Sequence, residues 1–118
     1  MSRLDRDIAE GLARERLVAR ARRLVSKWAP RLGVRIDEIH VKRMRSFWAS
    51  INEREHRMWI APELAEQPPA VLEYTIVHEL VHMLTDGHDA KFYRLMDRHL
   101  PGWRKVHRRC CGKLTPQG

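Results

Sequence analysis

The residues best suited to do chemistry are two histidines and a glutamate within the segment His78-Glu79-Leu80-Val81-His82. Residues four apart lie on the same face of an α-helix, so both imidazoles can bind one metal ion. Glu79 is rotated by about 100° around the helix from His78, so it flanks the ion instead of competing for it. That position suits a general base acting on a metal-activated water. Chance alone would produce this pattern about 0.03 times in a chain of this composition.

A third histidine, His88, follows the motif directly after Gly87. A chain that reverses direction at Gly87 can bring His88 back toward His78 and His82. Three histidines with an open fourth position are typical of a catalytic zinc site, whereas structural zinc sites have four protein ligands. The alternative is that the histidines are hydrogen-bonded within a core that holds no metal.

The motif requires a helix, and the sequence predicts one that begins at Pro69, where the missing N–H costs nothing. Gly87 is expected to end this helix as a left-handed cap. Apolar residues occupy more than one face, which predicts a mostly buried helix. These residues are Val71, Leu72, Ile76, Val77, Leu80, Val81 and Leu84. A last helix is expected over residues 89–99, with Asp89 as its N-cap.

Upstream of the motif, apolar residues at three- and four-residue steps predict a helix over residues 4–28, ended by Pro30 and Gly33. Alternating side chains then predict one extended segment from Ile39 toward Ile51, and a second strand over residues 57–60. Together the two strands suggest a short antiparallel sheet.

Length and composition fit one globular domain over residues 1–118, because the chain weighs only 14.0 kDa. The longest apolar runs are far below the ~18–20 residues of a membrane span. No apolar stretch follows the basic start, so no secretory signal is expected. The adjacent Cys110 and Cys111 cannot form a disulfide framework. We therefore expect a cytoplasmic protein without membrane contact.

The formal net charge of +8 is concentrated at the two ends of the chain. Residues 1–28 have eight Lys and Arg against four acidic residues, and residues 101–118 have five against none. Nucleic acid is therefore a candidate partner for the basic ends. The alternative is a solvated basic surface without a partner.

From His78 to Trp103 the sequence reads HELVHMLTDGHDAKFYRLMDRHLPGW and resembles the YgjP-like metallopeptidases. Their pattern is H-E-L-x-H-L, then H-S-x-x-F-W, then L-P-x-W/Y. Further matches are Leu32–Val34, Ile39–Met44, Pro68-Pro69 and Tyr74. The resemblance covers residues 17–110, and SprT-like proteases are more distant relatives with a longer gap before the third histidine.

The resemblance implies a minimal zincin-like α+β domain with an N-terminal helix, a short antiparallel sheet, an active-site helix and a C-terminal helix. It also implies that one zinc ion is bound by His78, His82 and His88, and that Glu79 is the catalytic base. A protein or peptide would be the substrate.

The strand expected to face the cleft departs from the family pattern R-W-G-S-C, because it reads Phe47-Trp48-Ala49-Ser50-Ile51. Trp48 and Ser50 are retained and are candidates to line the substrate cleft, although Trp48 is equally suited to the core.

Several other residues are weaker candidates. Tyr93 is a further candidate to line the substrate cleft, and Tyr93 and His99 could each stabilise an oxyanion or be structural. Glu73, Asp86 and Asp97 could each orient a ligand imidazole. Cys110 and Cys111 could bind metal or respond to oxidation, although an adjacent pair near a basic terminus usually has no such role.

These features favour a zinc-dependent metallopeptidase. Two alternatives remain open at this point. One is a nucleic-acid-associated module with an auxiliary zinc site, and the other is a zinc hydrolase that acts on a phosphoanhydride.

Overall fold

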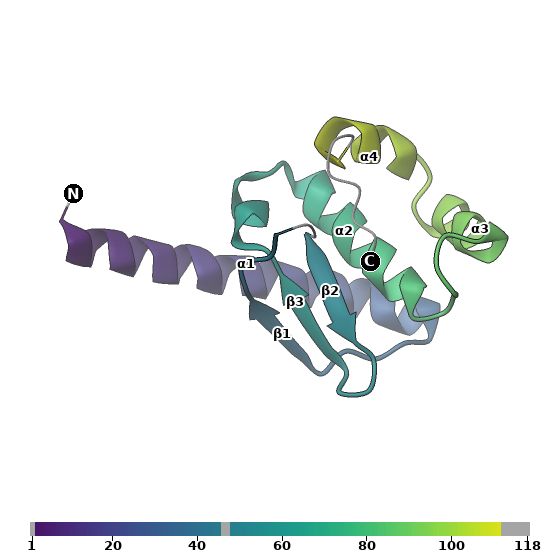
Figure 1. The fold of residues 1–118 in the computed structure, drawn as a ribbon, viewed down its shortest axis with the longest axis horizontal. Coiled ribbons are helices and arrows are strands. Elements are labelled where there is room, and N and C mark those ends of the chain that lie inside the picture. Colours follow the sequence, from purple (N-terminus) through teal and green to yellow (C-terminus); the bar gives the residue numbers. More distant parts are fainter. Residues whose placement is uncertain (1, 46–47, 112–118) are drawn as a thin grey trace.

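The computed structural model describes residues 2–45 and 48–111, and its elements confirm the expected α+β class (Figure 1). In this part of the chain one α-helix is followed by three strands and then by three more α-helices. The helices are α1 (Arg3–Leu32), α2 (Pro69–His82), α3 (Ala90–His99) and α4 (Trp103–Cys111). The strands are β1 (Glu38–Val41), β2 (Ala49–Asn52) and β3 (Arg57–Ile60), and a short 3₁₀ helix, η1 (Pro62–Glu66), follows them.

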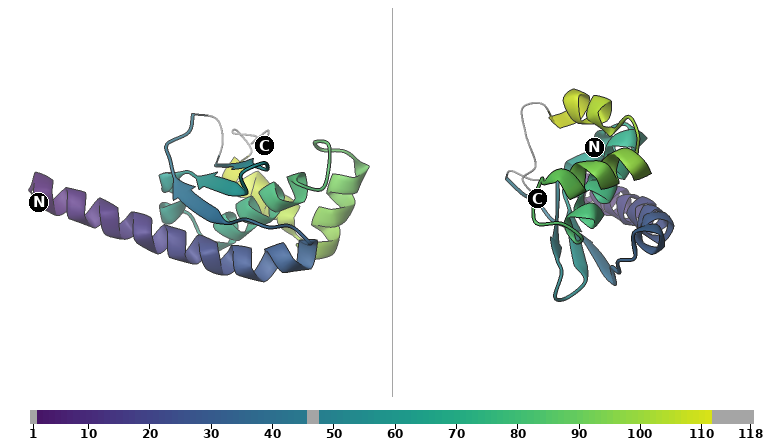
Figure 2. Two further views of the ribbon diagram at one scale, coloured as in Figure 1. Left: turned by 90° about the horizontal axis from the view of Figure 1, so that it is seen from below. Right: turned by 90° about the vertical axis from the view of Figure 1, so that its right-hand side faces the viewer.

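Helix α1 begins at a capping box, in which the Ser2 hydroxyl accepts a hydrogen bond from the Asp5 amide and the Asp5 carboxylate accepts one from the Ser2 amide. It ends at Gly33, whose φ of 72° gives the left-handed cap. Gly11 does not interrupt it. Side chains are buried only from Leu17 onward, so the first half of α1 projects from the body as an exposed arm (Figures 1 and 2).

The sheet corrects two expectations. The segment expected to extend from Ile39 to Ile51 forms two separate strands, β1 and β2, and Phe47 lies outside the described residues. The strand order is β1-β3-β2, with β2 antiparallel and β1 parallel to β3, so the sheet is mixed. A parallel pair cannot be joined by a tight turn. The alternation of side chains therefore reveals that β1 is a strand but not which strand it pairs with.

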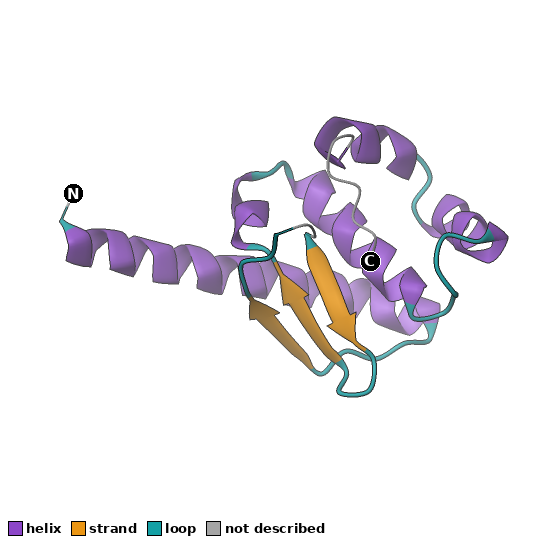
Figure 3. Cartoon of the chain, viewed as in Figure 1, coloured by secondary structure: helices purple, strands orange, loops and turns teal. Residues whose placement is uncertain are grey.

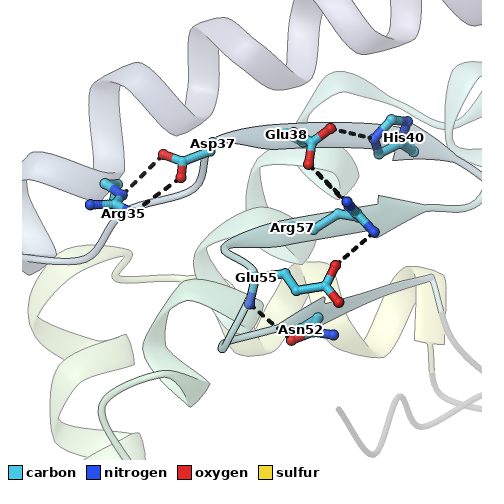
Figure 4. A network of polar contacts seen from close by, with 7 residues as sticks. All are labelled: Arg35, Asp37, Glu38, His40, Asn52, Glu55 and Arg57. Carbon is cyan, nitrogen blue, oxygen red and sulfur yellow. Dashed lines mark hydrogen bonds and ion pairs between the residues drawn. The ribbon is translucent and has the colours of Figure 1, made fainter.

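Polar side chains fasten one end of the sheet (Figure 4). The Arg57 guanidinium donates to Glu38 of β1 at 3.0 Å and is paired with Glu55 in the β2–β3 turn at 2.8 Å. The Glu55 amide donates to the side-chain oxygen of Asn52 at 3.1 Å. These contacts join β1, β3 and the β2–β3 turn at this end of the sheet.

Helix α2 is the central element, because it packs against α1, α3, α4 and β2 (Figure 3). Its start at Pro69 is as expected, but its end is not: the helix stops at His82, and Gly87 lies in the following loop with a φ of 95°. The Thr85 hydroxyl is within hydrogen-bond distance of the carbonyls of Val81 and Gly87, which favours a turn over continued helix.

Helix α3 agrees with expectation, since the Asp89 carboxylate accepts a hydrogen bond from the Phe92 amide at 2.9 Å and caps it. Helix α4 was not expected from the sequence. Among the helices of the described residues, none is both long and apolar enough to cross a membrane.

Candidate active site

The last turn of α2 and the loop after it bring three histidines together. One ligand nitrogen from each of His78, His82 and His88 lies within 4.8 Å of the other two. The Nε2 atoms of His82 and His88 are 3.1 Å apart. The loop containing Gly87 therefore returns His88 to the helix, as the sequence analysis expected.

The chemistry of this cluster suits a zinc ion. Zn–N bonds of 2.0–2.1 Å in a tetrahedral site separate two nitrogens by about 3.3 Å, close to the spacing of His82 and His88. Burial lowers the pKa of both His78 and His82 to about 3, so both rings are neutral at neutral pH. The neutral imidazole is the form that binds metal.

Phe92 of α3 packs against all three histidine rings. Its ring is buried, and its centroid lies 5.2 Å from that of His78, 4.8 Å from that of His82 and 4.6 Å from that of His88. No role for Phe92 was expected. Its match to the F of the family pattern H-S-x-x-F-W and its place on the buried face of α3 are the two signals that could have indicated one.

Glu79 is buried beside the histidines with a relative exposure of 4%. Its Oε1 lies 3.7 Å from Nδ1 of His78, beyond hydrogen-bond distance, and has no hydrogen-bond partner among the described residues. Burial raises the pKa of this carboxyl to about 8. An unpaired buried carboxyl costs stability, and such groups are concentrated at functional sites.

A cavity of about 650 Å³, which we call the β2 cavity, opens beside Glu79. Glu79 and His82 line it from α2, while Ser50 and its neighbours line it from β2. β2 is an edge strand, and no other strand of the described residues pairs with its outer side. Ser50 thus lies where the cleft was expected, whereas Trp48 does not line this cavity and packs against the core.

A second cavity of about 310 Å³, the α3–α4 pocket, borders the other side of the cluster at His78 and His88. Tyr93, a cleft candidate, lines this pocket and not the β2 cavity. Tyr74 and His107 also line it and are hydrogen-bonded to each other, with 2.8 Å between the hydroxyl and Nδ1.

Comparison with known proteins identifies the family. A family model described as the YgjP-like metallopeptidase domain matches residues 2–110. The chain belongs to this family. The resemblance noted in the sequence is thereby confirmed, and it extends further toward the N-terminus than residue 17. The chain is accordingly a metallopeptidase, and its family implies a metal cofactor.

Two solved structures share the fold. One is the metallopeptidase zymogen abylysin of Pyrococcus abyssi, with a TM-score of 0.69 and 19% identity, covering 82% of this chain and 97% of that one. The other is the metallopeptidase zymogen jannalysin of Methanocaldococcus jannaschii, with a TM-score of 0.66 and 20% identity, covering 80% and 97%. These similarities confirm the zincin-like α+β fold. No curated protein sequence matches the chain.

Two of the weaker candidates, His99 and Glu73, contact α1 instead of the histidine cluster. His99 packs edge-on against Trp28, with ring centroids 6.4 Å apart. Glu73 accepts hydrogen bonds from Trp28 and Lys27 and ties α2 to α1. Neither Glu73, Asp86 nor Asp97 is hydrogen-bonded to a histidine of the described chain, so the structure gives no support to a ligand-orienting role for them.

His107 is partly buried against Tyr74. The hydrogen bond explains this, because it satisfies the buried Tyr74 hydroxyl. Cys110 is also partly buried and packs against the core, while the side chain of Cys111 lies outside the described residues. Binding of nucleic acid by the basic ends remains a prediction.

Asp97 accepts hydrogen bonds from Trp103 Nε1 and from Arg104, and these bonds hold the pKa of its carboxyl below the usual value of 3.8. Because the folded-state pKa is lowered, the ionised group stabilises the fold above pH 3.8 and loses this effect as the pH falls. We expect Asp97→Asn to lower the Tm at pH 7, and the difference from wild type to shrink below pH 4. Thermal melts of both proteins from pH 7 to pH 3 would check this, and a difference independent of pH would contradict it.

Proposed function

We propose that this metallopeptidase cleaves peptide bonds with a zinc ion held by His78, His82 and His88, and with Glu79 as the general base. The observation that carries the proposal is the position of Glu79. Its carboxyl is buried beside the three imidazoles, has an oxygen without a hydrogen-bond partner among the described residues, and lines a cavity open to substrate. A purely structural carboxylate would be paired.

Bound zinc would polarise the substrate carbonyl and lower the pKa of the attacking water. The three imidazoles would hold the ion in place, with Phe92 packed against their rings. A cation beside Glu79 favours the ionised carboxylate, so Glu79 would accept a proton from water at neutral pH. It would then return this proton to the leaving amine.

The β2 cavity supports a peptide as the substrate. An extended peptide can add to a free strand edge through main-chain hydrogen bonds, and β2 offers such an edge beside Glu79. No lysine or arginine lines this cavity in the described part of the chain. A phosphoanhydride would require cationic groups around its phosphates. On the β2 side of the cluster, where Glu79 lies, the lining therefore favours an amide.

The test is a cleavage assay on an unstructured protein with the zinc-loaded enzyme. We expect fragments to appear, a chelator to stop their formation, and added zinc to restore it. Phosphate release from a nucleoside triphosphate, measured in parallel, should stay at background. Phosphate release without proteolysis would favour the phosphoanhydride alternative and contradict the proposal.

A further inference from the structure

We propose that the α3–α4 pocket binds a carboxylate of the substrate next to the scissile bond. The carboxylate belongs either to a Glu or Asp side chain or to the C-terminus of the peptide. This inference rests on the proposed peptidase function and names a substrate feature that the enzyme would select.

The location of the pocket connects it to the reaction. His78 and His88 form part of its lining, while Glu79 and His82 line the β2 cavity. The two cavities therefore border the same histidine cluster from different sides. A peptide positioned for attack over the cluster would place a residue that flanks the scissile bond at the α3–α4 pocket. Its volume of about 310 Å³ is at the small end for ligand pockets, which suits one residue.

An aromatic wall gives the pocket an apolar surface. The rings of Tyr93 and Trp103 are stacked with their centroids 6.1 Å apart, and the rings of Tyr74 and Trp103 are stacked at 6.2 Å. Tyr93 is 40% exposed, so its ring is accessible to a ligand. This wall can contact the methylene groups of a bound side chain.

Two arginines of α4 supply the charge. Arg104 and Arg108 are four residues apart, so they lie on the same face of the helix, and both line the pocket. The Arg104 guanidinium lies 4.6 Å from the Trp103 ring centroid and 5.8 Å from that of Tyr93. Asp97 bonds to both Arg104 and Trp103 and holds them in this arrangement. Arg108 has no ion-pair partner among the described residues.

The two cavities differ in the sign of their charge. No Asp or Glu of the described chain lines the α3–α4 pocket, whereas Glu53 lines the β2 cavity, which has no Lys or Arg. A guanidinium presents a planar set of donors that matches a carboxylate. An acidic group therefore fits the α3–α4 side and is disfavoured on the β2 side.

The experiment compares peptides that differ in one residue. A blocked alanine-rich peptide, its variants with one glutamate at successive positions, and the unblocked peptide with a free C-terminus are cleaved by the zinc enzyme. Mass spectrometry then locates the cut. We expect a glutamate or a free carboxylate at one position flanking the cut to raise kcat/KM about fivefold or more over the blocked alanine peptide. The two carboxylate sources are distinguished by which peptide shows the higher kcat/KM, the one with a glutamate side chain or the one with a free C-terminus.

Three variants assign the preference to the pocket. Arg108→Gln should lower the ratio of the carboxylate peptide to the alanine peptide about fivefold. Arg104→Gln should lower it by less, because the Arg104 charge is shared with Asp97. Arg109→Gln removes the same charge from the next residue, which does not line the pocket, and should leave the ratio unchanged. A ratio near one in the wild type, or an equal loss in all three variants, would overturn the inference while leaving the peptidase function intact.

A binding measurement separates this inference from the failure of catalysis. Fluorescence anisotropy of the same labelled peptides with the Glu79→Gln protein reports the preference without turnover. Tighter binding of the carboxylate peptide, weakened by adding Arg108→Gln, supports the pocket even if no peptide is cleaved. Equal binding of both peptides counts against it.

Discussion

Replacing Glu79 with glutamine should reduce the rate of peptide hydrolysis by ~10²–10⁴-fold while zinc stays bound, because a general base typically contributes this much. Glutamine has nearly the same shape, so the packing around α2 should be preserved. It cannot accept the proton from water, however. Cleavage rate, zinc content by atomic spectroscopy and Tm, measured on the same preparation, would check the prediction.

Glu63→Gln is the matched control, since Glu63 is an exposed carboxylate on η1 far from the histidines in sequence and does not line the β2 cavity. Its activity should equal that of the wild type. A module that binds nucleic acid around an auxiliary zinc would have no turnover to lose, and its affinity would not depend on Glu79. Wild-type turnover in Glu79→Gln would mean that another residue is the base.

Replacing His88 with alanine should remove most of the stability that zinc adds to the fold. A ligand that binds only the folded state stabilises it by ~2.7 kcal/mol when its concentration is 100 times the Kd. At a zinc concentration that saturates the wild type in this way, His88→Ala should show little increase in Tm over its metal-free form. Urea or thermal unfolding with and without zinc measures the difference.

His40→Ala is the control for this experiment, because His40 is exposed on β1 and contacts Glu38 instead of the cluster. It should retain the full stabilisation by zinc and a zinc content of about one ion per chain. Full zinc occupancy in His88→Ala would exclude His88 as a ligand.

Elements with local signals could be predicted from the sequence. Pro69 marks the start of α2, Asp89 caps α3, and Gly33 ends α1 in a left-handed conformation. The parallel pairing of β1 with β3 could not be predicted, because it joins segments separated by β2 and leaves no local pattern. Helix α4 did have a signal, since Trp103, Val106 and Cys110 are spaced as on one helix face and all pack against the core.

The same distinction applies to the candidate site: residue spacing within one helix could be predicted, whereas contacts between helices could not. The spacing of His78 and His82 places both on one face of α2 without any knowledge of the fold. The support from Phe92 and the pairing of Tyr74 with His107 depend on how α3 and α4 pack against α2. Glu73 illustrates the limit: it is close to the motif in sequence, yet it is turned toward α1.

The exposed arm of α1 has a consequence for how the chain loses structure. Helix nucleation is the unfavourable step, and the half of α1 from Leu17 onward is already held in a helix by packing. Each residue of the arm therefore only extends an existing helix. Residues 3–16 are exposed and bury no side chain, so unfolding this segment breaks few interactions besides its own backbone hydrogen bonds. The arm can therefore fray from the capping box at Ser2 inward, in a low-energy local transition that leaves the core and the histidine cluster folded.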